Sequence, residues 1–349
     1  MEYVPDELDY RIIHALQIDP RASWASLSPV IGAEAGTLGR RWKRIQKEGL
    51  AWTTALSVNM RDSGAILVVD CHPGTMHDVV LAFREMPQAI TIDVGTGNME
   101  LVITVVEHDG ESLARFLFED LRTTPNIRSV QAYLTTQTWK NGEQWRLGSL
   151  APDEVDAIPQ AKPPRRRAAK SISPNIESAI FTLLGPDARV PAAKVAQAAG
   201  VSLQRAQDAI DVMRERGDIK LRTHVNRSVS GWPIHLWYFL DVQPSKLDHI
   251  GKTLSSMGEV RFVASVAGSH NLIVSVWLRR LVQAHTFERF MEEKFGVVNI
   301  AGRSVIMRTV KYMGHLLDAS GQNQGVYVPM VTAVRARELE QGSHAGQVL

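Results

Sequence analysis

The chain repeats its N-terminal segment 168 residues later without a gap, and this repeat restricts the possible folds more than any other feature. Three sets of residues recur at this shift: Leu8, Ile12, Ile13 and Leu16 correspond to Ile176, Ile180, Phe181 and Leu184, Asp19-Pro-Arg21 corresponds to Asp187-Ala-Arg189, and Gly32 and Gly49 correspond to Gly200 and Gly217. The apolar spacing predicts an amphipathic first helix, and the glycines predict the ends of a second and a third helix. Each copy is therefore expected to be a winged helix-turn-helix, with an extended segment such as residues 50–58 after the third helix.

Two further segments share a different order of elements, strand–helix–strand–strand–helix–strand. In the first, strands are expected at residues 65–71, 89–95, 99–107 and 128–138, with helices near 75–86 and 110–122. In the second, strands are expected at residues 234–242, 259–267, 271–278 and 302–312, with helices near 244–257 and 280–295. This order predicts a four-stranded antiparallel sheet with both helices on one face, a ferredoxin-like fold. The opposite face is apolar and requires a partner sheet.

The fold class expected from these patterns is α+β, with two winged helix-turn-helix units, each followed by a ferredoxin-like βαββαβ domain. The domains are expected at residues 1–60, 61–150, 173–230 and 231–318, with a linker at 151–172 and a tail at 319–349. The linker contains the basic run Lys162-Pro-Pro-Arg165-Arg166-Arg167, which is either a solvated tether or a source of phosphate contacts. The tail is expected to be loose, unless residues 326–334 pack back on a domain.

Composition sets limits on partners and location. The formal net charge is only +2, so an argument for nucleic-acid binding depends on where the charges lie. The single cysteine, Cys71, excludes an internal disulfide framework and a multi-cysteine zinc site, as is usual in a reducing cytoplasm. No apolar run approaches the roughly 18 residues of a membrane span, and the acidic residues 1–9 lack the features of a signal peptide. We expect a cytoplasmic protein without a membrane partner.

The expected third helix of the first copy, residues 35–47, concentrates positive charge. Leu38, Trp42 and Ile45 form its buried side. The DNA-binding candidates are the residues expected to face outward or to lie near the helix start, Thr37, Gly39, Arg40, Arg41, Lys43, Arg44 and Lys47. The start of such a helix enters the major groove, so Thr37, Gly39, Arg40 and Lys43 are the best candidates for base contacts. Double-stranded DNA is the expected partner, and a solvated helix face is the alternative.

Two glycines, Gly36 and Gly39, fall within this helix. Each costs about 1 kcal/mol of helix propensity relative to alanine. That cost is tolerable where the helix approaches DNA or a neighbouring helix closely.

The second copy does not keep this charge. At the same shift, Arg40, Arg41, Lys43, Arg44 and Lys47 correspond to Asp208, Ala209, Asp211, Val212 and Glu215, whereas the core residues Trp42 and Ile45 correspond to Ile210 and Met213. Acidic residues repel phosphates, so the second unit is expected to be mainly structural. With one competent reader per chain, a palindromic operator would need two chains. We therefore expect a homodimer or a higher homo-oligomer.

The first copy resembles the winged helix-turn-helix of leucine-responsive (Lrp/AsnC) regulators. The residues that carry this resemblance are Leu8-Asp9, Ile12-Ile13, Leu16, Asp19, Arg21, Leu27, Gly32, Leu38, Arg41, Ile45 and Gly49. The βαββαβ order that follows looks like the effector-binding domain of that family, and the resemblance extends twice along the chain, from residue 8 to about residue 318. It implies a cytoplasmic transcriptional regulator that dimerises through its sheet domain, often assembles further, and responds to an amino acid or a related small molecule.

The resemblance also implies an effector site at the turn between the second and third strands, where the family has a Gly-x-x-Asp element. The corresponding residues here are Gly95, Thr96, Gly97, Asn98 and Glu100 in the first domain and Gly268, Ser269, His270 and Asn271 in the second. Glu100 and Asn271 occupy the aspartate position, and only Glu100 keeps a charge for an ammonium group, so the first site is the better candidate. Taken without the family, both segments are glycine hairpins that need a positive φ.

Two alternatives to a regulator remain open. Sirohaem decarboxylases, relatives with the same two-part architecture, are enzymes, and a metabolite sensor without DNA binding would also have these domains. The histidines show no HxxxH or Cys/His ligand spacing, and no G-x-S-x-G or P-loop motif is present. Gly95-Thr96-Gly97 opens a strand rather than a helix, unlike a dinucleotide-binding turn. We therefore expect no catalytic residue, no metal site and no cofactor.

Overall fold

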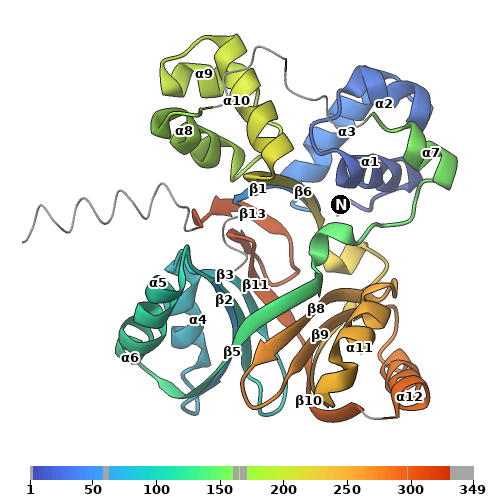
Figure 1. The fold of residues 1–349 in the computed structure, drawn as a ribbon. Coiled ribbons are helices and arrows are strands. Elements are labelled where there is room, and N and C mark those ends of the chain that lie inside the picture. The colour runs from blue at the N-terminus through green and yellow to red at the C-terminus, as the bar shows by residue number, and fades with distance from the viewer. Residues whose placement is uncertain (1–2, 58–62, 160–164, 166–170, 297, 331–349) are drawn as a thin grey trace, which may run out of the picture. The chain divides into compact units, whose positions relative to one another are not determined.

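A computed structural model of the chain describes residues 3–57, 63–159, 165, 171–296 and 298–330. The chain divides into two compact units, each assembled from segments of both halves of the sequence (Figure 1). Unit 1 comprises Met1–Met60, Arg146–Asn226 and Gln322–Leu349, and unit 2 comprises Arg61–Trp145 and Arg227–Gly321. The segments expected to be helix-turn-helix units thus share unit 1, and the segments expected to be ferredoxin-like share unit 2.

The N-terminal part of unit 1 is the predicted winged helix-turn-helix. Its elements are α1 (Glu7–Ile18), α2 (Trp24–Ile31), α3 (Ala35–Lys47) and β1 (Ala51–Ser57). Asp6 and Asp9 cap the start of α1 reciprocally, because each side chain accepts a hydrogen bond from the backbone N–H of the other. Gly32 ends α2 with a φ of +77°, a conformation that glycine adopts without strain.

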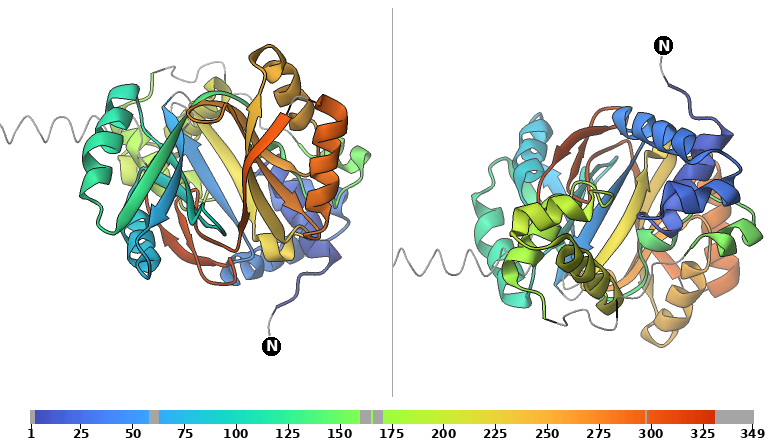
Figure 2. Two further views of the ribbon diagram at one scale, coloured as in Figure 1. Left: turned by 90° about the horizontal axis from the view of Figure 1, so that it is seen from below. Right: turned by 90° about the horizontal axis from the view of Figure 1, so that it is seen from above.

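Residues 174–225 form elements in the same order. These are α8 (Pro174–Leu184), α9 (Ala192–Ala199), α10 (Leu203–Arg216) and β6 (Ile219–Val225). Their core contains Ile176, Ile180 and Ile210, and the last two correspond at the 168-residue shift to the buried Ile12 and Trp42 of the first helices. Strands β1 and β6 pair antiparallel and lie side by side between the two groups of helices (Figure 2, right).

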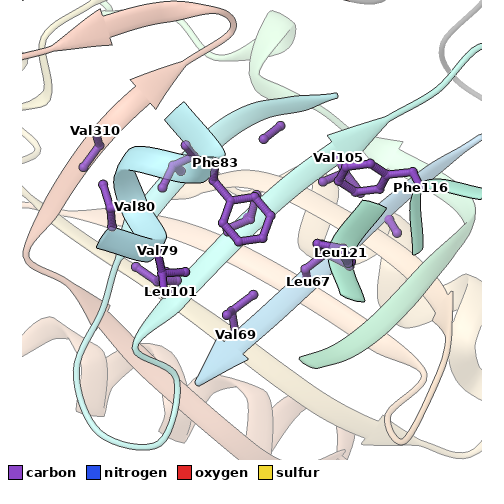
Figure 3. Packing of buried hydrophobic residues seen from close by; sticks show 14 of the residues in the cluster. Leu67, Val69, Val79, Val80, Phe83, Leu101, Val105, Phe116, Leu121 and Val310 are labelled. Atoms are coloured by element: carbon purple, nitrogen blue, oxygen red, sulfur yellow. The ribbon is translucent and has the colours of Figure 1, made fainter. Parts of the chain in front are cut away.

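The first half of unit 2 has the predicted βαββαβ order. Its elements are β2 (Gly64–Cys71), α4 (Met76–Glu85), β3 (Ala89–Val94), β4 (Leu101–Val106), α5 (Gly110–Arg115), a π-helical turn (Phe116–Asp120), α6 (Leu121–Thr123) and β5 (Ile127–Lys140). The strands pair antiparallel in the order β5-β2-β4-β3. Figure 3 shows Phe83 and Phe116, from the helical side, packed on Leu67, Leu101 and Val105 of the sheet. A ferredoxin-like fold is thus confirmed for this segment.

The second half of unit 2 follows with β7 (Ile234–Val242), α11 (Leu247–Ser255), β8 (Val260–Ala267), β9 (Leu272–Leu278), α12 (Gln283–Phe295), β10 (Val298–Ile306), β11 (Arg308–Tyr312) and β12 (His315–Leu317). The strand order is β10-β7-β9-β8. The prediction of a single strand at residues 302–312 is wrong, because the chain changes its pairing strand near Met307. Strand β10 pairs with β7, whereas β11 pairs with β3 of the first half.

The two sheets of unit 2 are joined by shared strands. Strand β5 pairs with β2 along its first part and with β8 along its second part. The inner faces of the sheets meet in one apolar cluster that includes Ile66, Tyr133, Trp237, Phe239 and Ile273. The helices lie on the outer sides with the strands between them (Figure 2, left). The partner sheet that the sequence required is therefore supplied by the same chain.

The segment expected to be a linker differs from the prediction at its start. Residues Pro152–Ala157 form α7, Ile158 is buried, and Glu154 makes an ion pair with Arg11 of α1 at 2.7 Å. Just before α7, the backbone N–H groups of Ser149 and Leu150 donate to Nδ1 of His14. These contacts hold residues 149–158 on the first helix-turn-helix. Of the basic run, only Arg165 belongs to the described residues.

The tail also packs on unit 1 over its described part. Residues Asn323–Tyr327 form β13, and the backbone N–H of Asn323 donates to the carbonyl of Gly49 at 2.9 Å. Met330 is buried. The alternative that the tail packs back is therefore the right one as far as residue 330, and residues 331–349 lie outside the described part of the chain.

Candidate DNA-binding helix and effector loops

Helix α3 has the two sides that the sequence predicted. Leu38, Trp42 and Ile45 are buried against the rest of the helix-turn-helix. The opposite side carries exposed cationic side chains, those of Arg40, Lys43, Arg44 and Lys47. Nη2 of Arg40 donates to Oγ1 of Thr37 at 3.0 Å, which orients this arginine along the first turns of the helix. The side chain of Arg44 lies over the ring of Tyr3, 3.9 Å from its centre. The exposed side of α3 is therefore strongly cationic.

Arg41 has a different role from the one expected. Its Nη1 donates to Oδ2 of Asp6 at 2.7 Å and to Oδ1 of Asp9 at 3.0 Å, and Asp9 is completely buried. The hydrogen bond that Arg41 donates to Asp6, followed by the one it donates to Asp9, raises the pKa of Arg41. Arg41 thus attaches α3 to the start of α1 instead of projecting toward a phosphate. Sequence periodicity missed this role because the partners lie more than 30 residues away.

Gly39 allows α3 to approach α2 closely. A Cβ at this position would lie 3.2 Å from Nε1 of Trp24, closer than most side-chain contacts. Of the two reasons considered for a glycine here, the structure supports packing on the neighbouring helix. Gly39 is accordingly a positioning residue for α3.

Helix α10 presents a different surface at the corresponding positions. Asp208 and Val212, which correspond to the exposed Arg40 and Arg44, are only 6% and 5% exposed. Both carboxylate oxygens of Asp208 accept hydrogen bonds from Arg165, at 2.9 and 2.6 Å. This hydrogen bonding to Arg165 is the main cause that lowers the pKa of Asp208. At the positions that correspond to Arg40 and Arg44, α10 therefore offers no exposed charge, and the carboxylate of Asp208 is neutralised by Arg165.

The first effector loop contains Gly95, Thr96, Gly97, Asn98 and Glu100. Gly97 has a φ of +73°, as a hairpin turn requires, whereas Gly95 has no positive φ. A Cβ on Gly95 would lie 2.6 Å from the carbonyl of Met99, so this glycine is needed for close approach.

Thr96 and Glu100 of this loop are already bonded to other strands of unit 2. The backbone N–H of Thr96 donates a hydrogen bond to Oγ of Ser304 at 3.1 Å, and this hydroxyl donates to the Thr96 carbonyl at 3.1 Å. Oε2 of Glu100 accepts from the backbone N–H of Cys71 at 2.7 Å, so its carboxylate caps the end of β2. Burial, with Glu100 nearby, raises the pKa of the Cys71 thiol to about 11.

The second effector loop, with Gly268, Ser269, His270 and Asn271, is filled by an aromatic side chain. Tyr133 lies against Gly268, its hydroxyl is 2.9 Å from Oγ of Ser269, and its ring stacks with that of His270 at 5.9 Å. Gly268 has no positive φ, so its small size, and not a turn conformation, is what the site requires.

Asn271 has the same role in the second loop as Glu100 has in the first, because its side chain binds backbone at the end of a strand. Its side chain accepts from the backbone N–H of Val242 at 2.9 Å and donates to the Val242 carbonyl at 2.7 Å, at the end of β7. Both residues at the aspartate position therefore have a structural role at a strand end. The carboxylate remains only in the first loop.

Comparison with known families supports the helix-turn-helix and the sheet domain of the first half. Residues 6–46 match the AsnC-type helix-turn-helix domain, and residues 64–145 match the Lrp/AsnC ligand binding domain. The two matches lie one after the other within the first 145 residues, in the order helix-turn-helix and then ligand-binding domain. The first matched range contains most of α3, and the second contains the first effector loop.

Relatives of the Lrp/AsnC segment are regulators. An uncharacterised HTH-type transcriptional regulator of Pyrococcus abyssi is 28% identical over 141 residues, which cover 39% of this chain and 89% of that protein. The HTH-type transcriptional regulator Ptr1 of Methanocaldococcus jannaschii is 25% identical over 143 residues, covering 40% of this chain and 97% of the relative. Together with the two family domains, these relatives support a DNA-binding transcriptional regulator that responds to a small molecule.

Similarity to a solved structure also extends along nearly the whole chain. The siroheme decarboxylase NirDL aligns with a TM-score of 0.58 over 97% of this chain and 99% of that chain, at 12% sequence identity. At this identity the similarity shows a common fold alone.

Over the described residues, no helix combines the length and apolar character needed to cross a membrane.

Proposed function

We propose that this chain is a transcriptional regulator whose α3 contacts DNA and whose unit 2 binds a small-molecule effector. The observation that carries the proposal is the exposed cationic side of α3, formed by Arg40, Lys43, Arg44 and Lys47. In a helix-turn-helix, the start of the third helix enters the major groove. Cationic side chains on that helix attract the phosphates on either side of the groove. Arg40, with Thr37 beside it, is our first candidate for a base contact.

We further propose that the second half of the chain is a diverged duplicate of the first. The 168-residue shift places α8, α9 and α10 on α1, α2 and α3, and the βαββαβ order of unit 2 occurs twice. Asp211 and Glu215 stand where α3 has Lys43 and Lys47. The duplicate therefore keeps the packing positions and has lost the charge that attracts DNA.

We place the effector at the first loop, between Gly95 and Glu100, and favour a small molecule with a carboxylate, such as an amino acid. Two contrasts between the loops support this choice. The first loop lies against Gly302 and Ser304, whereas the second lies against the bulky Tyr133. Glu100 also retains an anionic group, which Asn271 lacks.

The deciding experiment is a mobility-shift assay with the full chain and DNA from upstream of its own gene, over a range of salt concentrations. Arg40→Ala is expected to weaken binding by roughly 1 to 3 kcal/mol at every salt concentration, as the loss of a base contact does. Arg205→Ala on α10 is the matched control and should leave affinity unchanged. Equal losses from both variants would contradict the division of roles, and absence of binding by the parent protein would favour a metabolite sensor.

The second candidate function is a siroheme decarboxylase-like enzyme, favoured by the similarity to NirDL along the whole chain. It is distinguished by mixing the full protein with an iron porphyrin carboxylate under anaerobic conditions and recording the absorbance spectrum. A regulator should leave the spectrum unchanged. A shifted spectrum together with release of carbon dioxide would replace the regulator by the enzyme.

A further inference from the structure

The two helix-turn-helix segments of unit 1 hold each other through reciprocal arginine contacts. Nη1 of Arg21 donates to the carbonyls of Ala188 and Val190 at 2.6 and 2.9 Å. Nη1 of Arg189 donates to the carbonyls of Pro20 and Ala22 at 2.7 and 3.1 Å. Every donor and acceptor in the first set is 168 residues from its counterpart in the second. The two segments therefore present the same surface to each other, as the subunits of a twofold dimer do.

The pairing of β1 with β6 has the same symmetry. Thr54 lies opposite Arg222, and these residues are also 168 positions apart. On either side of this pair, Ala51 lies opposite Val225 and Ser57 lies opposite Ile219, the counterparts of Ser57 and Ala51 respectively. An approximate twofold axis thus passes between Thr54 and Arg222. One chain thus carries two third helices, α3 and α10, in segments related by an approximate twofold axis, as the two subunits of a dimeric helix-turn-helix regulator are.

The two helices so related differ in what they offer. On α3 the positions of Arg40 and Arg44 are exposed and cationic, whereas on α10 those of Asp208 and Val212 are buried. Arg165 donates hydrogen bonds to both carboxylate oxygens of Asp208. A phosphate or a base edge that approached α10 would meet the carboxylates of Asp211 and Glu215. It would find no exposed counterpart of Arg40.

We propose that one chain acts as a closed pseudo-dimer that reads a single, non-palindromic DNA sequence, with α3 in the major groove and the α10 position contributing no base contact. This inference rests on the proposed DNA-binding function. It identifies the partner as duplex DNA with one asymmetric recognition sequence per chain. A palindrome would then be two adjacent sites for two chains, each site bound by one α3.

The test uses the full chain and duplexes selected from random-sequence DNA. We expect the selected sequence to lack dyad symmetry, and hydroxyl-radical footprinting to show one protected patch for one bound chain, counted by sedimentation. An inverted repeat protected in two patches about 10 base pairs apart by one chain would overturn the pseudo-dimer inference while leaving DNA binding intact. Failure to bind any selected duplex would overturn the proposed function itself and this inference with it.

An exchange of matched surface residues sharpens the test. Lys47 of α3 and Glu215 of α10 correspond and are both exposed, so neither substitution should disturb folding. Lys47→Glu is expected to weaken binding of the selected duplex about tenfold and to reduce the salt slope. Glu215→Lys is expected to leave the selected sequence and the single patch unchanged. If Glu215→Lys changed binding or the selected sequence as much as Lys47→Glu does, with melting temperatures unchanged, the asymmetry would be contradicted.

Discussion

Neighbouring arginines on α3 have separate roles at the scale of single residues. Arg40 is exposed on the cationic side, whereas Arg41 is bound to Asp6 and to the buried Asp9. A charge engaged in two such hydrogen bonds contributes to stability and is not available to a phosphate. The helix therefore carries two adjacent arginines of which only Arg40 is free to project from the cationic side.

Arg41→Ala is expected to destabilise the protein, because it leaves the buried carboxylate of Asp9 with fewer partners. We expect a loss of about 1 to 3 kcal/mol of unfolding free energy, measured by urea unfolding. Arg40→Ala is the control and should change the free energy of unfolding by less than about 0.5 kcal/mol. If Arg41→Ala left stability unchanged and only weakened DNA binding, the role assigned to Arg41 would be wrong.

His14 predicts a pH dependence of stability. Burial, with a smaller effect of Arg146, lowers its pKa to about 4, and Nδ1 accepts two backbone hydrogen bonds as a neutral ring. An unfolded histidine takes up a proton near pH 6.5, so the stability from this group is present above pH 6.5 and is lost as pH falls toward 4. Between pH 7.5 and pH 5 the loss should be about 2 kcal/mol.

The measurement is urea unfolding of the parent and of His14→Gln at both pH values. Glutamine keeps an acceptor for the backbone of Ser149 and Leu150 but does not titrate in this range. The variant should therefore lose about 2 kcal/mol less than the parent on acidification. The same pH dependence in both proteins would rule out His14 as the cause.

At the scale of elements, the arginine contacts between α1–α2 and α8–α9 make a specific prediction. Arg21 and Arg189 each donate to two carbonyls of the other segment, and Arg189 also lies over the ring of Trp24 at 4.1 Å. Both substitutions to alanine should reduce unfolding free energy by about 1.5 to 3 kcal/mol, and Arg189→Ala by more, because it also removes the aromatic contact.

The double variant tests whether these contacts act as one interface. Residues that hold the same interface are coupled, so Arg21→Ala with Arg189→Ala should cost less than the sum of the single losses. Strict additivity in chemical denaturation would show that the two contacts are independent. Arg189→Lys, which keeps the charge without the planar group, should recover only part of the loss.

At the scale of the whole molecule, the shared strands of unit 2 predict that its two halves unfold together. Strand β5 belongs to both sheets, and the cluster around Ile66 and Ile273 joins their inner faces. Ile66→Ala should cost about 3 kcal/mol and reduce hydrogen-exchange protection equally in β2 and in β9. Phe118→Ala, at an exposed position of the same unit, should change neither.

Protection that fell in β2 and stayed constant in β9 would indicate two independent domains instead of one cooperative unit. Such a result would also limit how far an effector at the first loop can influence the second half. Coupling between sites requires elements that both sites share. Here the candidates for such elements are β5 and β11.

The sequence by itself determined the local structure and the distribution of charge. Helix faces, glycine helix ends and most strands of unit 2 could be predicted because each follows from a periodicity of 3.6 or 2 residues within a short window. The cationic side of α3 and its absence from α10 were equally visible, since they need only the helical spacing and the 168-residue shift.

Only the tertiary structure decided which of these surfaces meet. The partner of Arg41, the docking of α7 on α1, the division between β10 and β11, and the closure of Asp208 by Arg165 all join residues distant in sequence. No local period records such contacts, because their free energy depends on chain closure and on burial in the assembled fold. For the same reason, the repeat predicted a pair of similar domains, whereas the fold showed that each pair closes within one chain.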